Sequence, residues 1–197
     1  RRFRVERAGL GGWYAALYAG ELVNLLTDDE DAFPEVFDSL AGFLEVCQRR
    51  EHVKEHLLHF EWQLLEQTGH TPSVENCVNC GKRVAPWTEE RIPSDVVEIC
   101  RPQAGVREIQ AGSRGTVHFS LLEGGVLCAE CRPGKRSVLA IRGETLATLQ
   151  KLGGQQWGSE PLSPQIYGEL RGLLNQYFCH LLGQRPRMHD YLGLLGN

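Results

Sequence analysis

Two CxxC pairs are the residues of this chain whose type and spacing most clearly predict chemistry. The sequence reads Cys77-Val-Asn-Cys80-Gly81 at the first pair and Cys128-Ala-Glu-Cys131 at the second. Two intervening residues allow both thiolates of a pair to face one metal ion, and two pairs complete a tetrahedral four-cysteine site for Zn2+. Because such a site leaves no position for water, we predict a structural zinc ion that supplies folding energy, with four free thiols as the alternative.

The number of cysteines bears on the cellular compartment. An odd count of seven, including two CxxC pairs, suits metal ligation in a reducing compartment better than paired disulfides. We therefore expect a cytoplasmic protein. Cys47 and Cys179 lie on apolar helical faces, where they are expected to be small core residues. Cys100 lies between the two pairs, and nothing in the sequence makes it a ligand.

Amphipathic helices must position these cysteines. Apolar residues recur along the chain at three- and four-residue steps, which is the spacing of one helix face. The last helix has Ser163 as its N-cap, Pro164 in its first turn and Gly183 as its stop. The pattern predicts helices over residues 13–26, from 34 onward, 51–68, 144–152 and from 164 to the stop at Gly183.

The segment between the third and the last of the long helices has a different composition. It contains prolines, glycines and short β-branched runs at residues 96–99 and 116–122. We predict a mainly α fold, a helical bundle with an inserted four-cysteine zinc-binding module that contains short β-strands. The helical domain covers residues 9–76 and 137–197, and the module covers residues 77–136. Residues 1–8 alternate as in a strand and are interpreted as the remnant of an upstream domain, after which the glycines at 9, 11 and 12 break the chain.

No group of residues predicts catalysis. The chain lacks the GxSxG, HExxH, P-loop and GxGxxG motifs, and no nucleophile, base and orienting residue occur together. His52, His56 and His59 have the spacing i, i+4 and i+7, which suits a metal on one helix face, but no acidic partner motif accompanies them. They are interpreted as partly exposed helix residues, and the protein is predicted not to be an enzyme.

The charge balance limits the classes of partner. The net charge of −4 and the pI near 6.0 exclude a uniformly basic nucleic-acid binder, although a local basic patch can still bind phosphates. No apolar run approaches the roughly 20 residues that a bilayer requires, and no leader resembles a signal peptide, so no membrane partner is expected. Basic residues gather in four groups, at residues 1–7, 49–54, 132–136 and 185–187.

The order of several motifs resembles the RecO family of bacterial recombination mediators. The motifs span most of the chain; each alone is weakly specific, whereas the ordered set is fairly specific. They are Tyr18-Ala-Gly-Glu21-Leu22, Phe60-Glu61-Trp62-Gln63-Leu64-Leu65, Gly69-His70-Thr71-Pro72 leading into the first cysteine pair, Gly124-Gly125-Val126-Leu127 leading into the second, and Leu182-Gly183-Gln184-Arg185-Pro186-Arg187-Met188.

The resemblance implies a DNA-binding recombination mediator in the bacterial cytoplasm, at the nucleoid during repair. RecO-like proteins bind single- and double-stranded DNA, anneal complementary strands, and act with RecR to load RecA. They do so on DNA covered by the single-stranded DNA-binding protein SSB, whose acidic C-terminal tail they capture. The family also has an N-terminal OB-fold, which we do not expect within these 197 residues. The cysteine pairs are farther apart than expected for the family, and residues 86–115 are interpreted as an insertion.

Two sets of basic residues are assigned on this resemblance. Arg49, Arg50 and Lys54 lie beside the apolar face of the third helix, and basic groups next to a hydrophobic groove suit an acidic peptide with an apolar end. We predict that they bind the SSB tail. The predicted DNA contacts lie next to the second cysteine pair and beyond the last helix; they are Arg132, Lys135, Arg136, Arg185 and Arg187.

Two alternatives belong to other classes of protein. A helical bundle with a zinc staple can act as an interaction module that binds protein partners only, and the acidic net charge favours this alternative. A hydrolase or transferase with an unrecognised site is the weaker alternative, because the sequence offers no catalytic constellation. Binding of labelled single-stranded DNA discriminates between the mediator and the protein-only module.

Overall fold

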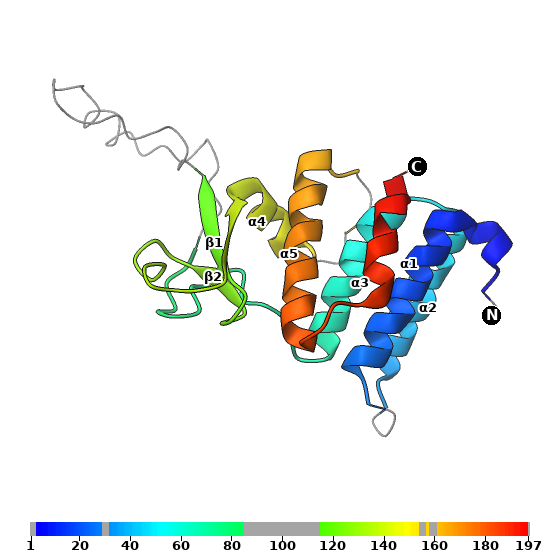
Figure 1. Ribbon diagram of the computed structural model, residues 1–197, viewed down its shortest axis with the longest axis horizontal. Helices are drawn as coiled ribbons and strands as arrows, with labels where there is room; N and C mark the ends of the chain where they lie inside the picture. Colours follow the sequence, from blue (N-terminus) through cyan, green and yellow to red (C-terminus); the bar gives the residue numbers. More distant parts are fainter. Residues whose placement is uncertain (1–2, 29–31, 85–114, 154–156, 158–160, 197) are drawn as a thin grey trace.

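Helices form most of the structure, and three short strands belong to one small sheet. The computed structural model describes residues 3–28, 32–84, 115–153, 157 and 161–196. A mainly α fold with an inserted strand-containing module is confirmed (Figure 1). The elements in chain order are α1 (Val5–Leu26), α2 (Pro34–Arg49), α3 (Val53–Gln67), β1 (Thr116–Ser120), β2 (Gly125–Leu127), β3 (Val138–Arg142), α4 (Gly143–Lys151), α5 (Pro164–Leu182) and the 3-10 helix η3 (Arg187–Gly196).

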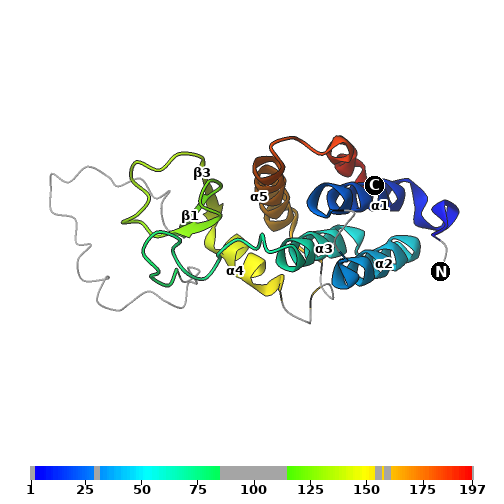
Figure 2. The same cartoon turned by 90° about the horizontal axis from the view of Figure 1, so that it is seen from below.

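The helices are arranged in two layers. One layer contains α5, η3 and α1, and the other contains α4, α3 and α2 (Figure 2). The apolar stripes predicted from sequence meet between the layers, where Tyr18, Leu22, Phe60, Leu64 and Phe178 are buried. Each such side chain contributes about 1.5–3 kcal/mol by leaving water, so this shared core holds the bundle together.

Helix α1 begins earlier than the sequence pattern predicts. The strand-like interpretation of residues 1–8 is wrong for residues 5–8, which form the first turn of α1. Gly9 has φ +66° and ψ 178°, which are not helical angles, so a kink at Gly9 separates this first turn from the long helix that continues to Leu26. A Cβ on Gly12 would lie 2.9 Å from the carbonyl oxygen of Cys47 on α2. The predicted break therefore occurs at Gly9, whereas Gly11 and Gly12 lie inside the helix, where Gly12 allows a close contact with α2.

The remaining helices follow their local signals. Helices α2, α3 and α4 lie where the periodicity places them, within one or two residues at each predicted end. At α5 the hydroxyl of Ser163 accepts a hydrogen bond from the N–H of Ile166 at 3.3 Å, and Gly183 ends the helix at φ +64°. Among the described helices, none is long and apolar enough to cross a membrane.

The sheet has the strand order β2-β1-β3, with both pairings antiparallel. Strand β1 lies in the run that was predicted at residues 116–122, whereas the run at 96–99 lies outside the described residues. Strand β3 begins just beyond residue 136 and completes the sheet. The ring of Phe119 on β1 is buried and meets Tyr177 of α5 edge to face, with centroids 5.9 Å apart. This contact packs the module against the bundle.

Candidate metal centre and basic surfaces

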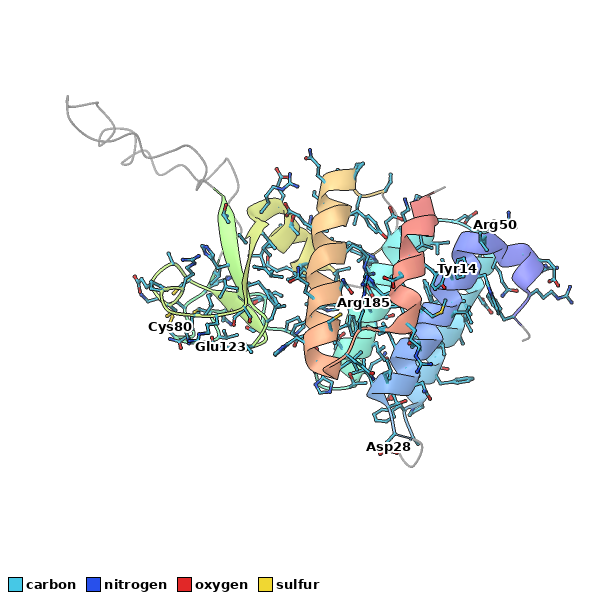
Figure 3. All side chains as sticks on the ribbon, in the orientation of Figure 1. Tyr14, Asp28, Arg50, Cys80, Glu123 and Arg185 are labelled. Atoms are coloured by element: carbon cyan, nitrogen blue, oxygen red, sulfur yellow. The ribbon has the colours of Figure 1, made fainter. Side chains whose placement is uncertain are left out.

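The four cysteines of the two CxxC pairs come together at one end of the module. Their Sγ atoms all lie within 4.8 Å of one another, and those of Cys80 and Cys128 are 3.7 Å apart. Tetrahedral zinc with Zn–S bonds of about 2.3 Å places its sulfurs about 3.8 Å apart. Cys77 is buried, whereas Cys80 lies at the outer end of the module (Figure 3). The type and spacing of the donors therefore fit a single metal ion.

Backbone hydrogen bonds fold each pair into a tight turn. The N–H of Gly81 donates to the carbonyl of Cys77 at 2.8 Å, and the N–H of Cys131 donates to that of Cys128 at 3.1 Å. Burial raises the pKa of the Cys77 thiol, but backbone N–H groups, including that of Cys128, outweigh burial and lower this pKa to about 6. Such donors stabilise the thiolate, which is the form that binds a metal.

Strand β2 brings the first pair to the second. The N–H of Val78 donates to the carbonyl of Val126 at 3.0 Å, and the N–H of Val126 donates to that of Ser73 at 2.8 Å. A Cβ on Gly125 would lie 2.5 Å from the Ser73 carbonyl oxygen and 2.6 Å from Cγ1 of Val78. This approach is closer than any side chain tolerates, so the glycine before the second pair is required for the two pairs to meet.

Side chains also link the pairs. The amide of Asn79 donates to Sγ of Cys131 at 3.3 Å, and the ammonium of Lys135 donates to Oδ1 of Asn79 at 3.0 Å. Lys135 also pairs with Glu123 at 2.5 Å. Lys135 was predicted to contact DNA, and the structure places it half-buried in this network with its charge compensated.

The other predicted DNA contacts lie in two separate places. Arg132 and Arg136 are exposed on the module, next to the second cysteine pair. Arg185 and Arg187 follow α5 in the helical part, where Figure 3 shows Arg185 apart from the cysteine cluster. Arg185 pairs with Asp190, whereas the side chain of Arg187 is exposed. The structure thus brings each subset together, but it does not unite the two.

An open cavity of about 520 Å³ contains two of the three residues predicted to bind the SSB tail. Arg50 and Lys54 line it, together with the glycine-rich start of α1 and Leu195 of η3. The guanidinium of Arg50 donates to the carbonyls of Arg7 and Glu6, at 2.6 and 3.2 Å. These bonds fix the Arg50 side chain without neutralising its charge, so it remains able to attract an anion.

Arg49 lies outside this cavity. Its guanidinium pairs with the carboxylate of Glu45 at 3.7 Å on the surface of α2. The structure therefore separates Arg49 from Arg50 and Lys54, although the three residues are close in sequence.

The histidines of α3 do not gather into a metal site. Among the described residues, the group whose ligand atoms lie close enough together to hold a metal ion is the four cysteines. Nδ1 of His59 lies 2.8 Å from the carbonyl oxygen of Leu152, and burial lowers the pKa of His59. Cys47 is buried and Cys179 partly buried, while Cys100 lies outside the described residues.

Sequence analysis missed a buried ion pair in the centre of the bundle. The guanidinium of Arg171 on α5 donates to both carboxylate oxygens of Glu61 on α3, at 2.6 and 2.5 Å. The hydroxyl of Tyr18 on α1 donates to the same carboxylate at 2.8 Å. Burial raises the pKa of Tyr18 well above its ordinary value, so its proton remains available for this bond. A glutamate on the apolar stripe of α3 was the signal available in the sequence.

A second missed contact holds the C-terminal segment. Both carboxylate oxygens of Glu21 on α1 accept backbone N–H groups at the start of η3, from Arg187 and Met188, each at 2.8 Å. A carboxylate at this end of a helix satisfies donors that have no partner within the helix. Glu21 therefore fixes where η3 begins along α1.

The fold and the site together define a helical protein that carries a four-cysteine module, with exposed arginines on the module and on the bundle. A family model described as Recombination protein O C terminal matches residues 8–107. The DNA repair protein RecO of Rhodopirellula baltica is 30% identical over 98% of this chain and 71% of that protein. The corresponding protein of Anaeromyxobacter sp. (strain K) is also 30% identical, over 100% of this chain and 67% of that protein.

A third relative, the DNA repair protein RecO of Neisseria gonorrhoeae, is 33% identical over 61% of this chain and 53% of that protein. The chain belongs to the RecO family of DNA repair proteins. This confirms the family that the ordered motifs indicated. The family comprises recombination mediators that are not enzymes, which agrees with the prediction from sequence.

Proposed function

We propose that this chain acts as a recombination mediator in bacterial DNA repair. It promotes annealing and, with RecR, the loading of RecA on single-stranded DNA covered by SSB, and it does so in the cytoplasm. Membership of the RecO family carries this proposal. No catalytic group is needed, because annealing requires neutralised phosphates on two strands held close together, and mediation requires a surface that competes for SSB.

The proposed cofactor is one structural Zn2+ held by the four cysteines. The sulfur spacing supports zinc, and a closed site of four thiolates has no open position for a substrate. The proposed module covers residues 77–136; the insertion proposed at 86–115 lies, up to residue 114, outside the described residues. Metal analysis of the purified chain should find one zinc per chain, and its absence from freshly purified protein would contradict this proposal.

The proposed DNA contacts include the two exposed arginines of the module. Arg132 and Arg136 can reach phosphates, whereas Lys135 is already paired. Fluorescence anisotropy with labelled single-stranded DNA tests this proposal at several salt concentrations. Each lost phosphate contact should lower the slope of log affinity against log salt by about 0.7. An unchanged slope in Arg132→Ala and Arg136→Ala would remove these residues from the interface.

The proposed site for the SSB tail is the cavity lined by Arg50 and Lys54. Its lining includes Leu10, Leu195 and the two cations, which suit an acidic peptide with an apolar C-terminus, together with one carboxylate, that of Glu55. Lys54→Glu should weaken the binding of such a peptide at least tenfold, because it converts an attractive charge into a repulsive one. The matched control is Arg49→Glu, which reverses a neighbouring charge outside the cavity. Equal losses in both variants would indicate a general effect of charge and would contradict this site.

The alternative function is a zinc-stapled module that binds protein partners only. The net charge of −4 favours it. Failure of the wild-type chain to bind single-stranded DNA at low salt, with peptide binding intact, would select this alternative.

A further inference from the structure

Two tyrosines stack on each other at the surface where η3 meets α1. The ring centroids of Tyr14 and Tyr191 are 4.8 Å apart, and the ring planes differ by 17°. Tyr191 is still 45% exposed although Tyr14 covers one face of its ring. The exposed area therefore lies on the parts of Tyr191 that Tyr14 does not cover. An exposed, immobilised aromatic ring is the kind of surface on which an unpaired nucleic-acid base stacks.

The surrounding structure holds Tyr191 in place. Glu21 fixes the start of η3 through two backbone N–H groups, and Leu192, the residue after Tyr191, is buried. Tyr14 belongs to α1, one of the long helices of the bundle. Because the open ring is already immobilised, a ligand that stacks on it orders little additional structure.

The apolar surface continues along α1 on both sides of Tyr14. Leu10 and Leu17 are exposed, and they lie on the same helix face as Tyr14 at the spacing i, i+4 and i+7. This strip is about 10 Å long, which is enough for two or three stacked bases. Figure 3 shows Tyr14 on the layer formed by α5, η3 and α1, the layer that also contains Arg185.

Positive charge lies at the start of the same 3-10 helix. The side chain of Arg187 is exposed. Two carboxylates of this region are engaged, since that of Glu21 accepts two N–H groups and that of Asp190 pairs with Arg185. Arg187 lies four residues before Tyr191 on η3, so its exposed charge is available to the phosphates of a strand that crosses this surface.

We propose that Tyr191, supported by Tyr14, is a base-stacking site for single-stranded DNA and that Arg187 binds the adjacent phosphate. The proposal rests on the proposed DNA-binding function and adds the place where an unpaired base is held. Such a site should bind single-stranded DNA in preference to duplex DNA. In a duplex each base is already stacked between its neighbours, so the exposed tyrosine ring has no partner there.

Fluorescence anisotropy of Tyr191→Ala and Tyr191→Phe with a labelled single strand and with its duplex tests the site. Tyr191→Ala should weaken single-strand binding roughly five- to hundredfold, the range that one stacked base contributes, and should leave duplex binding unchanged. Tyr191→Phe keeps the ring and should bind as the wild type does. The salt slope should be unchanged in Tyr191→Ala, which removes no charge, and lower by about 0.7 in Arg187→Ala.

The matched control is Phe37→Ala, which removes an aromatic ring that is 70% exposed on α2, in the other layer. It should leave DNA affinity unchanged. A base analogue whose fluorescence is quenched by stacking provides a second readout on the wild-type chain, so the test does not depend on the stability of Tyr191→Ala. If the wild type binds no single-stranded DNA, the proposed function fails. If it binds, the stacking site is refuted by full affinity in Tyr191→Ala, or by an equal loss of duplex binding.

Discussion

Replacing Arg171 by methionine should destabilise the bundle strongly. Arg171 supplies two of the three hydrogen bonds that the Glu61 carboxylate accepts, and Tyr18 supplies the third. The Glu61 side chain is 0% exposed and that of Arg171 is 13% exposed. Methionine keeps part of the volume of arginine, but it leaves a buried carboxylate without a cation and with one remaining donor.

The magnitude follows from this burial. Removal of one partner from a buried ion pair costs about 3–5 kcal/mol, because the other charge stays in the interior uncompensated. Arg171→Met should lie near the lower limit, at about 3 kcal/mol, since Tyr18 still donates to the carboxylate and Arg171 retains some contact with water. For a chain of this length, each kcal/mol lowers the melting temperature by about 2–4 °C, so a decrease of about 6–12 °C is expected.

Urea unfolding followed by far-ultraviolet circular dichroism measures this loss. Arg49→Met is the matched control, because the Arg49 side chain is 62% exposed and its pair with Glu45 is a surface pair. That control should change stability by at most about 0.5 kcal/mol. Adding Glu61→Leu to Arg171→Met should recover stability, because it removes the buried carboxylate that has lost its cation. A loss below about 1 kcal/mol in the single variant, or no recovery in the double variant, would refute the reasoning.

Three further predictions concern the module and the histidines. Gly125→Ala should lower zinc retention during dialysis, because the added Cβ has no room. Gly81→Ala is the control, since Gly81 has φ +72° in open space and the substitution should lower the free energy of unfolding by only about 1–2 kcal/mol. Equal zinc retention in the two variants would contradict the packing argument. Chelation or Cys80→Ser should unfold the described part of the module, residues 77–84 and 115–135, and leave most of the bundle folded; hydrogen exchange measures this element by element. Burial holds the pKa of His59 below its ordinary value of 6.5, so the unfolded chain binds the proton first. The contribution of His59 to the free energy of unfolding should be complete above pH 6.5 and should be lost as the pH falls through the pKa of His59 in the folded chain. The free energy of unfolding of His59→Gln should depend less on pH over this range.

Helix positions could be predicted where the signals are local. The end signals of α5 are Ser163, Pro164 and Gly183, which are read directly from the chain, and all three act as predicted. The predicted break is present at Gly9, but the helix resumes directly after it, because Gly11 and Gly12 are compatible with helical angles. Whether Gly12 interrupts a helix depends on the Cys47 carbonyl that approaches it from α2, and the local sequence does not contain that contact.

The 3-10 helix η3 shows the same limit more clearly. Its start is fixed by Glu21, which lies 166 residues earlier than Arg187 in the chain. A pattern within the last ten residues does not reveal that partner. The stacked pair of Tyr14 and Tyr191 depends on the same long-range contact, so it could not be predicted from the local sequence either.

The metal centre was predictable because ligand type and spacing within each pair are local properties. The meeting of the pairs is not local, and it depends on Gly125, which lets the chain around Ser73 approach β2. The ion pair of Glu61 and Arg171 was missed for a related reason. Each residue interrupts an apolar stripe on its own helix, and only the packing of α3 against α5 makes the two charges partners.

The family resemblance and the candidate binding surfaces share Arg185 and Arg187 of the last motif, but otherwise they depend on different residues. Tyr18, Glu21 and Glu61 stand in the motifs that indicated the family, yet the structure uses them to join α1 to α3, α5 and η3. Lys54 and Tyr191 lie outside those motifs and face a cavity or open surface. Motif residues of this kind specify the platform on which binding groups are placed. Variants at the exposed residues can therefore change binding while the fold is retained, and that separation is what the DNA and peptide experiments require.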